Sequence, residues 1–193
     1  MGARFYGCII SMLTGKISAS ATNRRTGLFV LSRTEIISFM KKAIPILIAI
    51  LVCFGVGCTA SYFQSESILN WYPTLNKPSF TPPNIAFPIA WSIIYLCMGI
   101  SIGLLWNVQV VRRQIIIKLF GLQLLFNFTW SIFFFYFQSP LLGFSNILLL
   151  DMFVIYYMIE SYPVKKWSAW LFIPYILWLL FATYLNGYIL VYN

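Results

Sequence analysis

Five apolar stretches, each long enough to cross a lipid bilayer as a helix, constrain the fold of this chain more than any other feature. A hydrocarbon core of about 30 Å needs roughly 20 consecutive apolar residues when they are helical. The sequence therefore predicts an all-α membrane protein, a five-helix transmembrane bundle with helices over residues 44–63, 85–107, 115–137, 141–159 and 168–191.

The composition agrees with a membrane protein and excludes several kinds of site. The residues are 61% hydrophobic and 9% charged, whereas an ordinary soluble domain carries about 25% charged residues. The chain has no histidine, which excludes histidine triads, histidine general bases and histidine ligation of metals or haem. The acidic residues and cysteines are scattered, and no nucleophile–base pair is evident. We therefore predict no metal site, no required cofactor and no conventional catalytic residue.

The basic residues lie in clusters between the apolar stretches and predict the orientation. The positive-inside rule places Lys and Arg on the cytoplasmic side. Of the 13 Lys and Arg residues, all but Lys77 lie before the first span, around the second-to-third connection or in the fourth-to-fifth connection. The N-terminus is therefore expected inside and the C-terminus outside. Because the basic residues lie in short clusters between apolar stretches, they argue against a nucleic-acid partner, despite the net charge of +9.

Three prolines mark expected features of the helices. Pro45 is expected in the opening turn of the first helix, where a missing amide hydrogen costs nothing. Ser139 is expected to cap the fourth helix, with Pro140 in its first position, so that helices three and four form an antiparallel hairpin. Pro174 lies inside the fifth helix and is expected to kink it near Trp170.

Residues 1–43 form a basic, Ser- and Thr-rich extension, which we expect to be poorly ordered, ahead of the membrane domain at residues 44–193. Its apolar runs are too short for a signal-peptide core or a span. Three interpretations stay open: a transit-like leader, an arm on the membrane surface, or an encoded start ahead of the natural one at Met40. Met40-Lys41-Lys42 directly before the first span favours a multi-pass protein of the bacterial cell membrane.

The first loop predicted on the outer side, residues 64–83, is rich in proline. Four prolines between residues 73 and 83 fix φ at several points, which favours a stiff cover over a flexible linker. Such a loop over a helix bundle suggests a lid on a cavity. The alternative is a surface loop whose prolines only delimit the second helix.

Aromatic and polar side chains share one face on each of three predicted helices. They recur at helical spacing as Phe87, Trp91 and Tyr95; as Gln123, Asn127 and Trp130; and as Pro174, Trp178 and Ala182. A buried indole N–H and an amide in hydrocarbon both need partners, so these faces could line an aromatic, sparsely polar pocket for a flat hydrophobic ligand. Ordinary packing within the bundle is the alternative.

The predicted fourth helix adds two polar residues, Asn146 and Asp151. An intramembrane carboxylate is a functional candidate by default, although a neutral Asp bonded to a neighbouring helix explains it equally well. On the second helix, Gly99 and Gly103 form a GxxxG motif. This motif permits close helix contact and is weak evidence for a dimer face.

Three motifs resemble the TspO/MBR family of tryptophan-rich sensory and translocator proteins. The first runs from Trp71-Tyr72 through Lys77-Pro78 to Pro82-Pro83 and is followed by Phe87, Trp91 and Tyr95. The second is Phe126-Asn127 with Trp130-Ser131, and the third runs through Trp170, Pro174-Tyr175, Trp178 and Phe181-Ala182 to Asn186. The similarity covers about residues 44–193.

The resemblance implies a five-helix bundle, commonly a homodimer, with a ligand cavity closed by the first loop. It implies ligands such as protoporphyrin IX and haem, and in animal members cholesterol and drug-like compounds. Carried over by motif, the pocket positions are Tyr72, Trp91, Tyr95, Asn127, Trp130, Trp178 and Ala182, to which we add Asn146. The lid positions are Trp71, Phe80, Pro82 and Pro83.

Three departures from the family pattern narrow the expected ligands. Phe80 stands where the family often has Trp. Tyr192 is followed by Asn193 and not by the Lys or Arg of the cholesterol-recognition pattern, which argues against tight sterol binding. Because the chain has no histidine, only Tyr, Cys or Met could ligate haem iron, so we expect metal-free porphyrin held by stacking.

Four functions remain open at this point. The favoured one is a membrane receptor or carrier for tetrapyrroles. The others are a light- and oxygen-dependent breakdown of protoporphyrin IX that uses Trp91 and Trp178, a bundle with a structural or partner-binding role, and a proton-coupled transporter built on Asp151.

Overall fold

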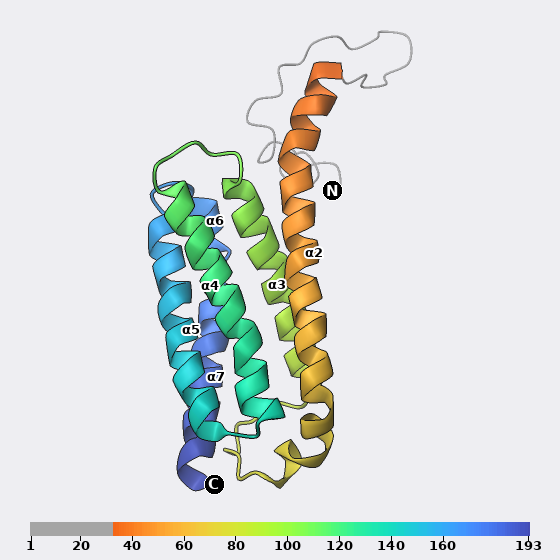
Figure 1. The fold of residues 1–193 in the computed structure, drawn as a ribbon, viewed down its shortest axis with the longest axis vertical. Helices are drawn as coiled ribbons and strands as arrows, with labels where there is room; N and C mark the ends of the chain where they lie inside the picture. The colour runs from red at the N-terminus through yellow and green to blue at the C-terminus, as the bar shows by residue number, and fades with distance from the viewer. Residues whose placement is uncertain (1–32) are drawn as a thin grey trace, which may run out of the picture. The chain divides into compact units, whose positions relative to one another are not determined.

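The computed structural model describes residues 33–193, and all regular structure in that range is helical. The elements are α2 (Arg33–Asn70), η1 (Tyr72–Thr74), α3 (Ala86–Leu105), α4 (Arg113–Ser131), η2 (Ile132–Tyr136), α5 (Pro140–Ser161), α6 (Lys166–Trp170) and α7 (Ile173–Tyr192). Within the described range, 5 helical segments are long and apolar enough to cross a membrane, which confirms the expected number of spans (Figure 1). Which terminus lies inside stays a prediction.

The chain divides into two compact units, residues 1–45 and 46–193. Of the first unit, residues 33–45 are described, and they form the opening turns of α2. The interpretations of the N-terminal extension otherwise concern residues 1–32, which lie outside the described residues. The second unit holds the rest of α2 and all the later elements, and it contains the site described below.

α2 is longer at both ends than the predicted helix over residues 44–63. It begins at Arg33, so residues 33–43 are helical and Pro45 lies inside the helix instead of in its opening turn. It ends at Asn70, so the connection to α3 begins at residue 71 and not at residue 64. The prediction followed apolarity, which falls after residue 63. A helix continues through polar residues until a breaker intervenes, here Pro73, which has no amide hydrogen to continue the α-helical bonding and lies in the short turn η1 that follows α2.

The turn between α4 and α5 confirms the predicted hairpin (Figure 1). α4 widens into the π-helical turn η2, in which the Phe137 amide donates to the Ile132 carbonyl at 2.9 Å. Gln138 then takes a left-handed conformation, with φ of 50°, and reverses the chain. The Ser139 hydroxyl accepts a hydrogen bond from the Leu142 amide, and Pro140 opens α5, as predicted.

The fifth span is broken where the sequence predicted a kink. α6 ends at Trp170 and α7 begins at Ile173, with Pro174 in its first turn. Proline has no amide hydrogen and its ring clashes with the carbonyl four residues earlier, which is that of Trp170. The two helical pieces are therefore separate elements.

Gly99 and Gly103 allow α3 to approach α2 closely within one chain. A Cβ atom added at Gly99 would lie 2.6 Å from the Ile50 Cα, and one added at Gly103 would lie 2.5 Å from the Ile46 Cα. The GxxxG motif is thus occupied by α2 of the same molecule. It gives no support to a dimer face on α3.

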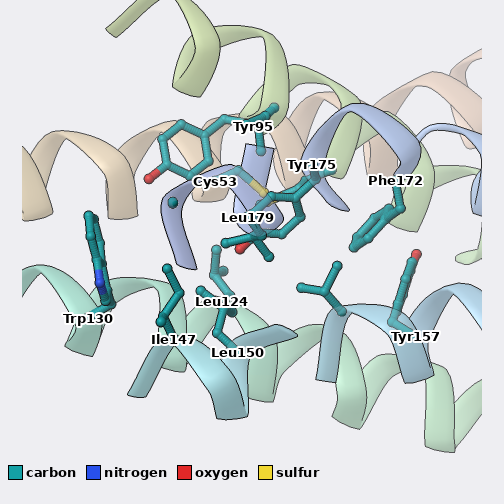
Figure 2. Close-up of a cluster of buried hydrophobic side chains, with 14 of the residues drawn as sticks. Cys53, Tyr95, Leu124, Trp130, Ile147, Leu150, Tyr157, Phe172, Tyr175 and Leu179 are labelled. Atoms are coloured by element: carbon teal, nitrogen blue, oxygen red, sulfur yellow. The ribbon is translucent and has the colours of Figure 1, made fainter. Parts of the chain in front are cut away.

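A continuous core of buried apolar side chains joins the helices of the second unit. Figure 2 shows Tyr157 beside Phe172 at one end of this core and Trp130 at the other. The rings of Tyr157 and Phe172 stack with centroids 4.1 Å apart. Outward-facing side chains are also apolar; Leu51 is 71% exposed and Leu177 is 64% exposed. An apolar outer surface suits contact with lipid.

Candidate functional site

The second unit encloses a cavity of about 390 Å³ between α2, α3, the end of α4 and the loop from residue 71 to residue 85, here called the α2–α3 loop. Pockets for small molecules are typically about 300–1,000 Å³ and mostly apolar, with a few polar groups. Of the predicted pocket residues, the structure brings five together in its lining: Tyr72, Trp91, Tyr95, Asn127 and Trp130.

α3 supplies the aromatic wall of the cavity. Phe87, Trp91 and Tyr95 lie on one face of the helix, as their spacing predicted, and all three line the cavity. The rings of Trp91 and Tyr95 stack with centroids 5.6 Å apart and 25° between their planes. Trp130 of α4 lies 6.4 Å from Trp91, ring to ring. The cavity therefore presents flat aromatic surfaces from two helices.

Asn127 forms the polar centre of the cavity wall. The Tyr95 hydroxyl donates to Asn127 Oδ1 at 3.1 Å, and Asn127 Nδ2 donates to the Tyr175 hydroxyl of α7 at 3.0 Å. The Trp130 indole N–H donates to Asn186 Oδ1, also on α7, at 3.1 Å. Buried polar groups that are paired in this way hold the surrounding side chains in one arrangement. The aromatic wall is therefore fixed before any ligand enters.

α2 forms the opposite wall, which the sequence analysis did not predict. Its contribution is a stripe of mainly small and polar residues: Phe54, Gly57, Cys58, Ser61, Gln64 and Ile68. Gly57 leaves room for the Tyr95 ring, which a Cβ atom would overlap. Gln64 Nε2 donates to the Ser131 hydroxyl, and the Ser67 hydroxyl donates to the Phe135 carbonyl, so the end of α2 is tied to α4 and η2. The spacing of these residues by three or four was the signal available in the sequence.

The α2–α3 loop contributes to the cavity lining through Tyr72. Tyr72 is buried and lines the cavity, and this burial raises the pKa of its phenol above the ordinary value. Asn84, just before α3, also lines the cavity. The predicted lid residues Trp71, Phe80, Pro82 and Pro83 lie in this part of the chain but are absent from the lining.

The lid residues pack elsewhere on the bundle. Trp71 meets the edge of Phe134, with centroids 5.5 Å apart. Phe80 is 79% exposed and touches Phe181 of α7 with its ring edge, at 6.3 Å. Trp71 and Phe80 therefore attach the loop to η2 and α7, and its contribution to the cavity lining comes from Tyr72 and Asn84.

Three predicted pocket residues, Trp178, Ala182 and Asn146, do not line the cavity. Trp178 packs edge to face on Phe87 at 5.6 Å and so supports the aromatic wall without lining the cavity. Ala182 is buried, and its carbonyl accepts from Asn186 Nδ2. Asn146 lies between α5 and α4, where its Nδ2 donates to the Thr129 hydroxyl at 2.9 Å. α7 packs mainly against α5, so its face lies behind the cavity.

Asp151 is likewise absent from the cavity lining. Its Oδ2 accepts a hydrogen bond from the Thr183 hydroxyl of α7 at 2.7 Å. The arrangement is that of a polar residue paired with a neighbouring helix, the alternative that the sequence left open. This pairing with Thr183, away from the lining, gives no support to proton-coupled transport through the cavity.

The cavity lining among the described residues contains hydroxyl, amide and thiol groups but no charged side chain. No cluster of three or more potential metal ligands occurs within residues 33–193. The arrangement suits the binding of a flat, largely apolar molecule by stacking. It holds no nucleophile with an adjacent base.

Comparison with known proteins agrees with this geometry. The sequence model of the TspO/MBR family matches residues 49–192. The tryptophan-rich protein TspO of Archaeoglobus fulgidus is 38% identical over 75% of this chain and 94% of its own length. TspO of Chlorobaculum tepidum is 36% identical over 79% of this chain and 98% of its own length. The human translocator protein is 30% identical over 68% of this chain and 80% of its own length.

Proposed function

Because the chain belongs to the TspO/MBR family, we propose that it binds a tetrapyrrole of the protoporphyrin IX type in its aromatic cavity and acts as a sensor or a carrier. It is an integral, multi-pass membrane protein, and relatives from bacteria agree with the cell membrane expected from the sequence. A homodimer, and sterols or drug-like compounds as further ligands, belong to the same proposal.

The single observation that carries this proposal is the grouping of Trp91, Tyr95 and Trp130 into one aromatic wall of an uncharged cavity. Offset or edge-to-face aromatic contacts contribute about 0.5–1.5 kcal/mol each beyond the burial of apolar surface. A porphyrin macrocycle is flat and aromatic, so it can use several such contacts at once. The chain lacks histidine, so the proposal is metal-free porphyrin held by stacking, with haem as a weaker ligand.

A titration in the dark tests the proposal. Protein in nanodiscs is titrated with protoporphyrin IX, and binding is followed by the shift of the porphyrin absorption band. We expect saturable binding that weakens about two- to tenfold in Trp91→Phe, the equivalent of one aromatic contact. Trp178→Phe is the matched control, because Trp178 supports the wall without lining the cavity.

Two outcomes would contradict the proposal. A linear, unsaturable signal would mean that the porphyrin only partitions into the lipid. Saturable binding that neither Trp91→Phe nor Trp130→Phe weakens would place the ligand outside the cavity and favour a structural role for the bundle.

A second candidate is the light- and oxygen-dependent breakdown of the bound porphyrin, with O₂ as the oxidant. The favouring observation is that Trp91 contacts two tyrosines, Tyr95 at 5.6 Å and Tyr175 at 6.1 Å, which could stabilise a radical on the indole. Trp178, the other residue expected to act, is outside the cavity lining. Illumination of the bound complex in air should then yield product, and a Trp91→Phe variant that still binds should yield much less.

A further inference from the structure

Within residues 33–193, the cavity lining has no charged group that would pair with the carboxylates of the proposed ligand. Porphyrins of the protoporphyrin type carry carboxylate side chains on one edge of the macrocycle. An ionised carboxylate buried without a partner loses several kcal/mol of solvation. No cation lines the cavity among the described residues. The carboxylate edge must therefore stay at the rim, where water or a cation can reach it.

Lys77 of the α2–α3 loop is a cation in direct contact with a residue of the cavity lining. Its Nζ donates to the Tyr72 carbonyl at 2.8 Å and lies 4.4 Å from the centroid of the Tyr72 ring, which lines the cavity. An ammonium group has three N–H donors, and this contact uses one. Lys77 has no acidic partner among the described residues; the ion pair found there joins Arg112 to Glu160. The other donors of Lys77 are thus open to an anion.

The backbone next to Lys77 is fixed in place by the end of α7. The Asn76 amide donates to Asn193 Oδ1 at 2.8 Å, and Asn193 Nδ2 donates to the Asn76 carbonyl at 3.1 Å. Asn76 Nδ2 also donates to the Tyr192 carbonyl at 3.1 Å. A cation on a fixed backbone loses less conformational entropy when it binds a partner.

The remaining cations of the bundle lie at the opposite ends of the helices. Between residues 43 and 111 the sequence has one Lys or Arg, which is Lys77. Arg113 and Lys166 begin α4 and α6, whereas the cavity is lined by the end of α4 and the beginning of α3. They also have partners there, the rings of Trp106 and Tyr162.

We propose that Lys77 is the carboxylate-binding residue of the cavity. The ligand class is then a flat aromatic body with a carboxylate on one edge, the body against the aromatic wall of Trp91 and Trp130 and the carboxylate on Lys77 at the rim. This inference rests on the proposed function and adds the orientation and the charge requirement of the ligand.

The test compares protoporphyrin IX with its dimethyl ester, which has the same macrocycle without the charge. Both are titrated in nanodiscs of uncharged phosphatidylcholine against the wild type, Lys77→Met, Lys77→Arg and Lys118→Met. Lys77→Met should weaken protoporphyrin IX about tenfold, the equivalent of about 1.4 kcal/mol, and leave the ester within about twofold. Lys77→Arg should retain most of the affinity. Lys118→Met, an exposed cation of α4, is the matched control and should change neither ligand.

The outcomes separate this inference from the proposed function. If Lys77→Met weakens both ligands equally, Lys77 acts only by supporting Tyr72, and the inference is wrong. If both ligands bind the wild type saturably and Lys77→Met changes neither, the tetrapyrrole cavity stands and the carboxylate site does not. If neither ligand binds the wild type, the proposed function fails first and the inference fails with it.

Discussion

Asn127 is the side chain on which the internal order of the cavity depends most. Its amide pairs with Tyr95 on α3 and with Tyr175 on α7, and all three groups are buried. Asn127→Ala leaves two hydroxyls without these partners, so we expect it to lower the free energy of unfolding by about 2 kcal/mol. Tyr95→Phe removes one of the bonds and should cost about half as much. Unfolding by denaturant in one detergent measures both, and equal stability of Asn127→Ala and the wild type would contradict the role.

The buried phenol of Tyr72 should make the stability of the protein depend on pH in the alkaline range. Burial raises the pKa of its phenol above the ordinary value, which is about 10. Above that pH the unfolded chain releases this proton before the folded chain does, so stability is complete below about pH 10 and falls as the pH rises through the raised pKa. Tyr72→Phe should flatten this fall in melting temperature. Tyr62→Phe, at a residue 78% exposed, should not, and identical profiles for the two variants would refute the assignment.

At the residue scale, helical spacing alone located the aromatic wall of the cavity. Phe87, Trp91 and Tyr95 had to share a face whatever the tertiary structure, because they lie on one unbroken helix. Trp178 lies in an equally regular stripe on α7. The neighbour of that stripe depends on how α7 packs against α5, which helical spacing does not predict. The α2 wall was missed because its members, such as Gly57 and Ser61, are small and carry no aromatic signal.

At the element scale, the close approach of α3 to α2 requires glycine at positions 99 and 103, where a side chain would overlap α2. A Cβ atom at Gly103 would lie 2.5 Å from the Ile46 Cα, so backbone must move. Gly103→Ala should therefore lower the free energy of unfolding by about 1–3 kcal/mol, as overpacking does. Gly121→Ala is the matched control, because nothing lies within 4 Å of its added Cβ, and it should be neutral or slightly stabilising.

The same pair of variants tests the alternative use of the motif. If Gly99 and Gly103 instead formed a dimer face, Gly103→Ala would convert a dimer into a stable monomer. Size-exclusion chromatography with light scattering, beside the unfolding curve, separates these results. Loss of stability without a change in mass supports the contact with α2.

The number of spans was predictable from the sequence. The ends of the helices were predictable only where a few consecutive residues carry a capping or breaking signal. Ser139 and Pro140 fixed the start of α5 because capping is a property of a few consecutive residues. The end of α2 was misplaced because residues 64–70 are mostly polar yet contain no breaker, and the side chains of Gln64 and Ser67 contact α4 and η2. That contact is tertiary and leaves no local mark in the sequence.

At the scale of the whole molecule, the cavity and the clustered cations lie at opposite ends of the helices, so the orientation decides on which side of the membrane the cavity lies. The cavity and Lys77 lie at the helix ends joined by the α2–α3 loop, whereas the clustered cations of residues 112–118 and 165–166 lie at the other ends. If the positive-inside rule holds, the cavity mouth faces away from the cytoplasm. A carboxylate-bearing ligand would then enter from the outer side of the membrane.

Reporter fusions in a bacterial host decide the orientation. Alkaline phosphatase joined after Asn193 should be active and green fluorescent protein joined there should be dark, because the first needs export and the second needs the cytoplasm to fold. Fusions at Asn107, in the connection between α3 and α4, are the matched control and should give the opposite pair of results. A fluorescent fusion after Asn193 would show that the protein has the opposite orientation in the membrane. The α2–α3 loop would then face the cytoplasm, and ligand would have to reach Lys77 from inside the cell.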